Sequence, residues 1–222
     1  MQSKSRGSTK QIIFMIAIAI FSIAMGIWMS QKIQLADNDH QIPYGLDATV
    51  LPNARVLNNF TLTDDNNKKF NVEALKGHWS FLFFGYTNCP DVCPITLKVM
   101  QQVWKSLPTK MNTKGHPRLY FISVDPDRDS LSTLKKYVDF FNPEFTGVTG
   151  KLDELDKLTK QIGILYGYED KESDNNNYTV NHSAQLILFD PQARMRAVFS
   201  PPHEAKTIAA NFQTIRVFYG DK

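Results

Sequence analysis

A long apolar segment near the N-terminus constrains this chain more than any other feature. Residues 12–29 read IIFMIAIAIFSIAMGIWM, and no charged residue lies between Lys10 and Lys32. As a helix this segment would extend about 27 Å, close to the thickness of the hydrocarbon core of a bilayer. A cleaved signal peptide and a buried core helix are the alternatives. Signal peptides have apolar regions of about 7–15 residues and end at a small-x-small site, which the following SQKIQLAD does not provide. The segment therefore predicts one transmembrane helix.

The charges around the apolar segment predict its orientation. All the charged residues that precede it are basic, and by the positive-inside rule they keep residues 1–11 in the cytoplasm. Residues 30–56 are polar and contain prolines and a glycine, so we expect a tether that leads to a domain formed by residues 57–222. The short N-tail has no Arg- and Ser-rich presequence, which favours a bacterial inner membrane over a mitochondrial one. The domain would then face the periplasm.

The basic character of the chain is confined to its N-terminus. The whole chain has 222 residues and a formal charge of +3, while residues 1–32 hold four basic residues and no acidic one, so the remainder carries −1. The remainder also lacks a basic stripe with interleaved aromatic residues, and we expect no nucleic-acid partner. Its length and apolar content suit one globular domain.

The apolar pattern of the predicted domain alternates between strands and helices. Two continuous apolar runs, 80–85 and 118–124, have the length and composition of buried central strands. Alternating patterns around turn residues predict hairpins at 60–63 with 69–72 and at 184–189 with 194–199, and helical periodicity covers 95–107, 131–141, 152–162 and 203–218. The predicted order of elements after the first hairpin is strand–helix–strand, helix, hairpin and helix. This order indicates an α/β fold of the thioredoxin-like type, with an extra N-terminal β-hairpin.

The only two cysteines of the chain, Cys89 and Cys93, lie four residues apart between a predicted strand and a predicted helix. A disulfide between them would close almost no chain, so its entropic benefit would be small. Four residues are about one helical turn, so both sulfur atoms can emerge on one face. A helix N-terminus also stabilises a thiolate. We therefore interpret the pair as a chemical site and not as a structural crosslink.

Metal binding is the chemistry that this cysteine pair favours. Thiolates are soft ligands that select Cu(I), with zinc as the main rival, and an imidazole would complete the site and suit Cu(II) as well. His182 lies directly before the apolar run 184–189, at a loop that faces the cysteines in a thioredoxin-like layout. A buried, hydrogen-bonded histidine is the alternative role for it. For the other histidines, His40, His78, His116 and His203, we expect surface or helix-capping positions.

Several motifs resemble those of the Sco (SenC) family, the copper chaperones of cytochrome c oxidase assembly. They are FFGYTNCPDVCPITL, FISVDPDRDS and NHSAQLILFDP, and the resemblance extends over the N-terminal apolar segment and FTLTDDNNKKF. It implies that Cys89, Cys93 and His182 bind copper as Cu(I) and Cu(II). It also implies a role in metallating the dinuclear copper centre of oxidase subunit II, with a periplasmic copper donor or thiol reductant as a further partner.

Two features beside these motifs bear on the site. Asp125, Asp127 and Asp129 match the acidic loop of the family, and we expect a turn there in which Asp129 caps the following helix. Asn181 departs from the family pattern, in which an aspartate commonly precedes the histidine. The missing carboxylate would make the site less anionic and alter its affinity for Cu(II), without removing a ligand.

A thiol-disulfide oxidoreductase is the alternative function. Cys89 and Cys93 would then be a redox-active pair that reduces the cysteines of the same copper centre. General oxidoreductases use C-x-x-C and place a cis-proline opposite it, whereas this chain has C-x-x-x-C and its loop 178–183 supplies His182 and no proline. We therefore favour a metallochaperone over an enzyme. The two roles are compatible, because the cysteines must be reduced before copper binds.

Overall fold

The computed structural model describes residues 8–37, 45–108, 116–171 and 178–220. They belong to two units, Met1–Ile42 and Pro43–Lys222, and each unit is described by itself. Residues 1–7 of the predicted N-tail and residues 38–44 of the predicted tether lie outside the described residues.

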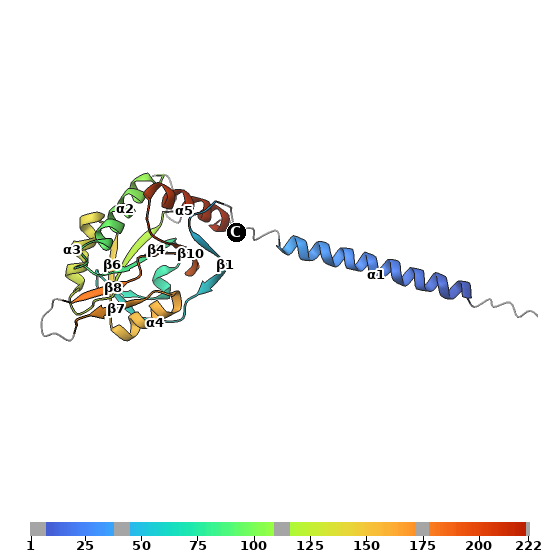
Figure 1. The fold of residues 1–222 in the computed structure, drawn as a ribbon, viewed down its shortest axis with the longest axis horizontal. Helices are drawn as coiled ribbons and strands as arrows, with labels where there is room; N and C mark the ends of the chain where they lie inside the picture. The colour runs from blue at the N-terminus through green and yellow to red at the C-terminus, as the bar shows by residue number, and fades with distance from the viewer. Residues whose placement is uncertain (1–7, 38–44, 109–115, 172–177, 221–222) are drawn as a thin grey trace, which may run out of the picture. The chain divides into compact units, whose positions relative to one another are not determined.

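The first unit contains the helix α1 (Ser8–Asp37; Figure 1). Among the described residues, α1 is the one helix that is long and apolar enough to cross a membrane, over Gln11–Ser30. The side chains of residues 11–30 are exposed. The helix continues into residues 31–37, where the predicted tether begins. This stretch contains good helix formers and neither glycine nor proline, so nothing ends the helix there.

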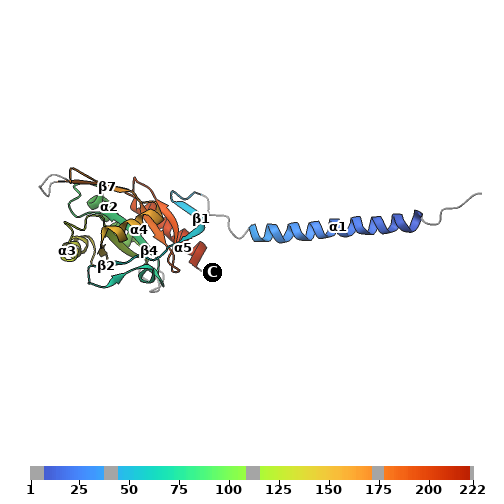
Figure 2. The ribbon, with the colours of Figure 1, turned by 90° about the horizontal axis from the view of Figure 1, so that it is seen from below.

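The second unit is built on an eight-stranded sheet with the order β1-β10-β9-β4-β5-β6-β2-β3 (Figures 1 and 2). Its strands are β1 (Thr49–Val56), β2 (Leu62–Asp64), β3 (Lys69–Phe70), β4 (Ser80–Gly85), β5 (Arg118–Ser123), β6 (Thr146–Thr149), β9 (Leu186–Phe189) and β10 (Arg194–Phe199). The helices are α2 (Val92–Ser106), α3 (Leu131–Phe141), α4 (Leu152–Ile162) and α5 (Ala205–Gly220), with a 3-10 helix at Val72–Leu75.

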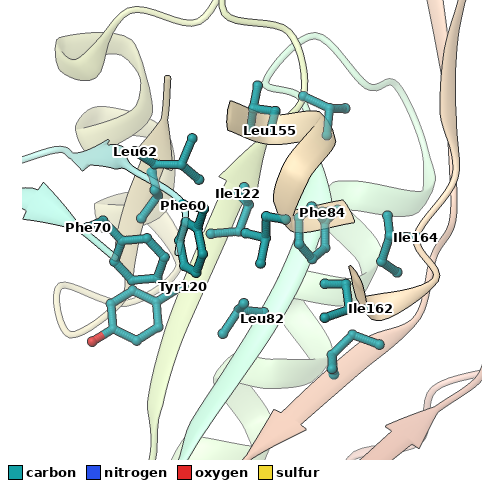
Figure 3. Close-up of a cluster of buried hydrophobic side chains, with 14 of the residues drawn as sticks. Phe60, Leu62, Phe70, Leu82, Phe84, Tyr120, Ile122, Leu155, Ile162 and Ile164 are labelled. Atoms are coloured by element: carbon teal, nitrogen blue, oxygen red, sulfur yellow. The ribbon is translucent and has the colours of Figure 1, made fainter. Parts of the chain in front are cut away.

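The alternation of side chains along β4 divides the core between the two faces of the sheet. Phe81 packs against Trp104 of α2 and Phe212 of α5, with ring centroids 6.3 and 5.5 Å apart. Leu82 and Phe84 point to the opposite face and lie in a cluster with the apolar side chains of α4 (Figure 3). All six residues of β4 are buried, as the continuous apolar run predicts.

The predicted central strands and both predicted hairpins are present. β4 runs parallel to β5, with Ser80 opposite Arg118. The hairpins β2–β3 and β9–β10 are antiparallel. β2 also pairs with β6, so the extra N-terminal hairpin extends the main sheet. β6 itself is not among the predicted strands, because four residues of sequence TGVT carry too little periodicity to be recognised.

The predicted boundary at residue 57 differs from the structure, which places residues 49–56 in the sheet as β1. This strand pairs antiparallel with β10, and its register shifts between Val50 and Arg55. Pro52 lies within this shift and has no N–H group to donate to the neighbouring strand. Proline is tolerated here because β1 is an edge strand with an irregularity. The same proline suggested a tether when only the sequence was considered.

A second, two-stranded sheet lies outside the eight-stranded sheet. It consists of β7 (Tyr166–Glu169) and β8 (Thr179–His182), which pair antiparallel with Tyr166 opposite His182. The predicted loop that carries His182 is therefore a strand. Both strands are short, and all but one of their residues are exposed or only partly buried, so burial imposes no clear alternation on their sequences.

Candidate metal centre

The three residues predicted as metal ligands lie together in the structure. Ligand atoms of Cys89, Cys93 and His182 all lie within 4.8 Å of one another. The Sγ atom of Cys93 is 3.3 Å from Nε2 of His182. Both cysteines are free thiols, Cys89 half-buried and Cys93 buried. Two sulfur atoms and one imidazole nitrogen at this spacing can converge on one metal ion.

The cysteines reach the site from two different local structures. Cys89 lies in the loop after β4, where its N–H donates to the carbonyl oxygen of Tyr86 at 3.2 Å. Cys93 lies in the first turn of α2, which begins at Val92. The expectation that both cysteines occupy one helical turn is therefore wrong for Cys89. The loop brings its sulfur to the first turn of the helix all the same.

Gly85 makes room for the buried cysteine. A Cβ atom at this position would lie 2.5 Å from Sγ of Cys93 and 2.9 Å from the ring of Phe121. Real Cβ atoms essentially never approach other atoms so closely. The last residue of β4 therefore has to lack a side chain if Cys93 is to pack against the strand end.

The pKa values of the two cysteines are shifted in opposite directions. The Cys93 thiol donates a hydrogen bond to the sulfur of Cys89 and lowers the pKa of Cys89 against the opposing effect of burial, and His182 adds to the lowering. The same hydrogen bond, together with burial and the charge on Cys89, raises the pKa of Cys93. Of the two cysteines, Cys89 is therefore the one that loses its proton more readily.

His182 is oriented with one ring nitrogen toward the cysteines. Its Nδ1 lies 3.2 Å from the carbonyl oxygen of Ser183. A carbonyl can only accept a hydrogen bond, so Nδ1 donates in this contact and Nε2 is the ring nitrogen that faces Cys93. The rings of Phe83 and Tyr86 contact the imidazole at 6.3 and 6.0 Å between centroids. A ligating histidine is commonly held in this way through its second nitrogen.

Asp129 holds the loop of Cys89 and does not cap a helix. Its carboxylate is buried and accepts hydrogen bonds from the N–H of Thr87 (2.9 Å), the Thr87 hydroxyl (2.5 Å) and the Ser123 hydroxyl (2.6 Å). The N-cap of α3 is Ser130, which accepts from the N–H of Thr133, so the predicted cap is wrong by one residue. Burial raises the pKa of Asp129 against these hydrogen bonds.

The other two aspartates of the acidic loop also make side-chain contacts. Asp125 is fully buried and pairs with Arg128. Asp127 is exposed and lies 2.8 Å from Nζ of Lys171. None of the acidic loop belongs to the cluster of possible metal ligands found among the described residues.

Asn181 and the remaining histidines lie apart from the ligand atoms. Asn181 is exposed, and its Nδ2 donates to Oε1 of Glu169 at 2.5 Å. His78 is buried beside the Tyr120 hydroxyl, so its predicted surface position is wrong. His203 precedes α5, where its Nε2 donates to the Ala184 carbonyl. His116 is partly buried. His40 lies outside the described residues.

Sequence comparison identifies the family. Residues 48–216 match the SCO1/SenC family model. The chain belongs to this family. A protein of Stutzerimonas stutzeri is 36% identical over 154 residues, which cover 69% of this chain and 73% of that protein. The match begins within one residue of β1 and supports the inclusion of that strand in the domain.

Solved structures of Sco proteins share the fold. Bradyrhizobium japonicum ScoI, solved with copper bound, is 32% identical in sequence to this chain. The match covers 71% of this chain and 98% of ScoI, with a TM-score of 0.62. BsSco, a member of the Sco family of cytochrome c oxidase assembly proteins, is 21% identical with a TM-score of 0.58 and covers 76% and 96% of the two chains. The thioredoxin-like α/β fold is therefore confirmed.

Proposed function

We propose that this protein binds copper through Cys89, Cys93 and His182 and helps to metallate the dinuclear copper centre of cytochrome c oxidase subunit II. The observation that carries the proposal is the convergence of the three ligand atoms within 4.8 Å in a member of the SCO1/SenC family. Copper is bound in the solved ScoI of Bradyrhizobium japonicum, and the wider family is described by its role in oxidase assembly.

The chemistry of the three groups suits copper as a cargo. Two sulfur ligands favour Cu(I), and the neutral imidazole accommodates Cu(II). Cys89 and His182 are only half-buried, so a partner's ligands can approach the metal and replace them one at a time. We expect the site to bind both Cu(I) and Cu(II). Zinc is the competing metal ion, because the same side chains can bind it.

The membrane arrangement is part of the proposal. We place residues 12–29 across the bacterial inner membrane as a single span, residues 1–11 in the cytoplasm and the copper-binding unit in the periplasm. The length and apolar character of α1 support the span, and the basic residues before it support the orientation. The stretch between helix and domain would act as the tether and let the site reach a membrane-bound oxidase.

Thiol-disulfide reduction is a second candidate, favoured by the lowered pKa of Cys89. The Cys89 thiolate would attack a disulfide in the target and release one target thiolate. Cys93, after losing its proton, would attack the mixed disulfide, release the second target thiol and leave a Cys89–Cys93 disulfide. A periplasmic thiol reductant would then return both cysteines to thiols. This route uses the same reduced pair that copper binding requires.

Anaerobic titration of the protein with Cu(I) and with Cu(II) tests the main proposal. We expect one copper ion per chain, and loss of tight binding in Cys89→Ser or Cys93→Ser. His182→Ala should weaken Cu(II) binding by more than the roughly 10- to 100-fold that loss of an outer-shell partner costs, while Cu(I) binding and the fold persist. Equal Cu(II) affinity in the parent and His182→Ala would contradict the ligand assignment. Rapid reduction of an oxidised subunit II fragment, together with poor copper transfer to it, would instead favour the reductase.

A further inference from the structure

The strand that carries His182 is attached to the main sheet by side chains and by the short link of residues 183–185 to β9. β7 and β8 form their own two-stranded sheet and have no ladder to the eight-stranded sheet that positions the cysteines. A two-stranded hairpin by itself is only marginally stable in water. The separation between His182 and the cysteines is therefore set by whatever attaches β7 and β8 to the rest of the domain.

Most of the polar attachments of this hairpin end on the segment that follows β5. The Tyr168 hydroxyl donates to the carbonyl oxygen of Val124 at 2.5 Å. The Tyr178 hydroxyl donates to Oδ1 of Asp125 at 2.5 Å. Arg128 donates from Nη1 to the carbonyl oxygen of Tyr178 at 2.9 Å. A further hydroxyl contact, from β7 to Asp156, leads to α4.

Arg128 connects the two halves of the site. Its Nε donates to Oδ2 of the fully buried Asp125 at 2.5 Å. Its guanidinium carbon lies 3.6 Å from the ring centroid of Tyr178, directly before β8, and 5.5 Å from that of Tyr86, in the loop before Cys89. Removing one partner of a buried charge pair strongly destabilises the surrounding structure, because the other charge stays buried without compensation. The side chain of Arg128 is thus fitted to hold the hairpin against the cysteine loop.

We infer that Arg128 is a positioning residue that keeps the β7–β8 hairpin in place so that His182 can join the two cysteines on copper. The inference rests on the proposed function and adds a residue that touches neither the metal nor a ligand. At the other end of the same short segment, Asp129 holds the cysteine loop through Thr87. The six residues that follow β5, residues 124–129, therefore attach to both halves of the site.

Amide hydrogen exchange of the metal-free, full-length protein in detergent tests the positioning directly. In Arg128→Ala, exchange of residues 166–169 and 179–182 should become about 10- to 100-fold faster, as expected when charge-assisted hydrogen bonds of a local unit are lost. Exchange in β4 and β5 should not change. Lys135→Ala is the matched control, because it removes the same charge from an exposed ion pair on α3.

The copper spectrum supplies a second measurement on the same variants. Nitrogen hyperfine coupling in the Cu(II) spectrum should weaken in Arg128→Ala toward that of His182→Ala, while Cu(I) binding by the cysteines persists. Arg128→Lys should restore part of the coupling, since its ammonium can pair with Asp125 but lacks the planar fork that also reaches Tyr178. The Lys135→Ala spectrum should equal that of the parent.

Two outcomes would overturn the inference. One is unchanged exchange in β7 and β8 of Arg128→Ala, and the other is an equal acceleration in β4 and β5. If Arg128→Ala does not fold, Tyr178→Phe replaces it: this change removes only the hydroxyl bond to Asp125 and should accelerate the same hairpin amides. If the parent binds no copper, the proposed function fails, while the metal-free exchange still decides whether Arg128 holds the hairpin.

Discussion

At the residue scale, the site depends on neighbours that bind no metal. Asp129 restrains the cysteine loop through Thr87. The Ser183 carbonyl orients the imidazole of His182, and Gly85 leaves the space that the Cys93 sulfur occupies. Each of these contacts controls where a ligand atom lies, so small changes at any of them should disturb metal binding without altering the ligands themselves.

Gly85→Ala should show this most directly. The added methyl group would lie 2.5 Å from Sγ of Cys93, so either the helix start or the strand end must shift. We expect a loss of roughly 1–3 kcal/mol in the free energy of unfolding together with weaker Cu(I) binding. Denaturant titration and copper competition measure the two effects. Gly167→Ala is the control, because a Cβ there meets nothing within 4 Å; equal effects of the two substitutions would contradict the packing argument.

His78 gives the domain a specific pH dependence. Burial lowers the pKa of His78 from 6.5 to about 4, with the nearby Arg118 acting in the same direction. The unfolded state therefore binds more protons between these values, and stability falls as the pH falls through this window. Between pH 7 and pH 4.5 this histidine should account for about 2–3 kcal/mol of lost unfolding free energy. His78→Gln should show a correspondingly shallower pH dependence in denaturant unfolding, and an identical dependence would count against the assignment.

At the element scale, the fold brings the two parts of the site together from different sheets. The cysteines follow β4, a buried central strand, whereas His182 ends β8 in the separate two-stranded sheet. The eight-stranded sheet is in turn completed at one edge by β1. The elements with the strongest sequence signals are thus the central ones, and the peripheral strands are those that sequence patterns miss.

The contribution of β1 can be measured with two fragments. A fragment that begins at residue 57 lacks the ladder between β1 and β10 and the buried side chains of Ala48 and Val50. It should be less stable than a fragment that begins at residue 43 by roughly 2 kcal/mol or more. Denaturant unfolding compares them, and equal stability would show that residues 43–56 act as a tether after all.

At the scale of the whole molecule, the chain combines an apolar helix with a folded unit whose Cys89, Cys93 and His182 have the geometry of a metal site. The proposed delivery of copper to a membrane-bound oxidase would use both, since the helix would keep the site close to the partner. The formal charge is divided in the same way, with the basic excess before and just after the apolar segment and a slightly acidic remainder.

Reporter fusions test the proposed orientation. Alkaline phosphatase, which is active only outside the cytoplasm, should be active when fused after residue 222 in a bacterial host. Replacing the basic residues at positions 4, 6 and 10 by glutamine should lower that activity, because in the proposed orientation these charges would retain the N-tail in the cytoplasm. A cytoplasmic reporter that is active at the same C-terminal position would contradict the orientation.

Local periodicity and residue chemistry are sufficient to predict several features of this protein. The apolar segment predicts α1, the continuous runs predict β4 and β5, and the C-x-x-x-C motif with His182 predicts a site for a soft metal. These signals are local, because hydrogen-bonding periods and turn chemistry act over a few residues. The thioredoxin-like arrangement followed from their order along the chain.

The distances between the proposed ligand atoms depend on the tertiary structure. Cys93 and His182 are 89 positions apart, and their contact depends on where a hairpin outside the main sheet is held. The roles of Arg128, Asp129 and Gly85 cannot be predicted from the sequence either. Each of them acts on neighbours that are close in space, and most of these neighbours are distant along the chain. Packing between elements, which no local pattern encodes, determines these distances.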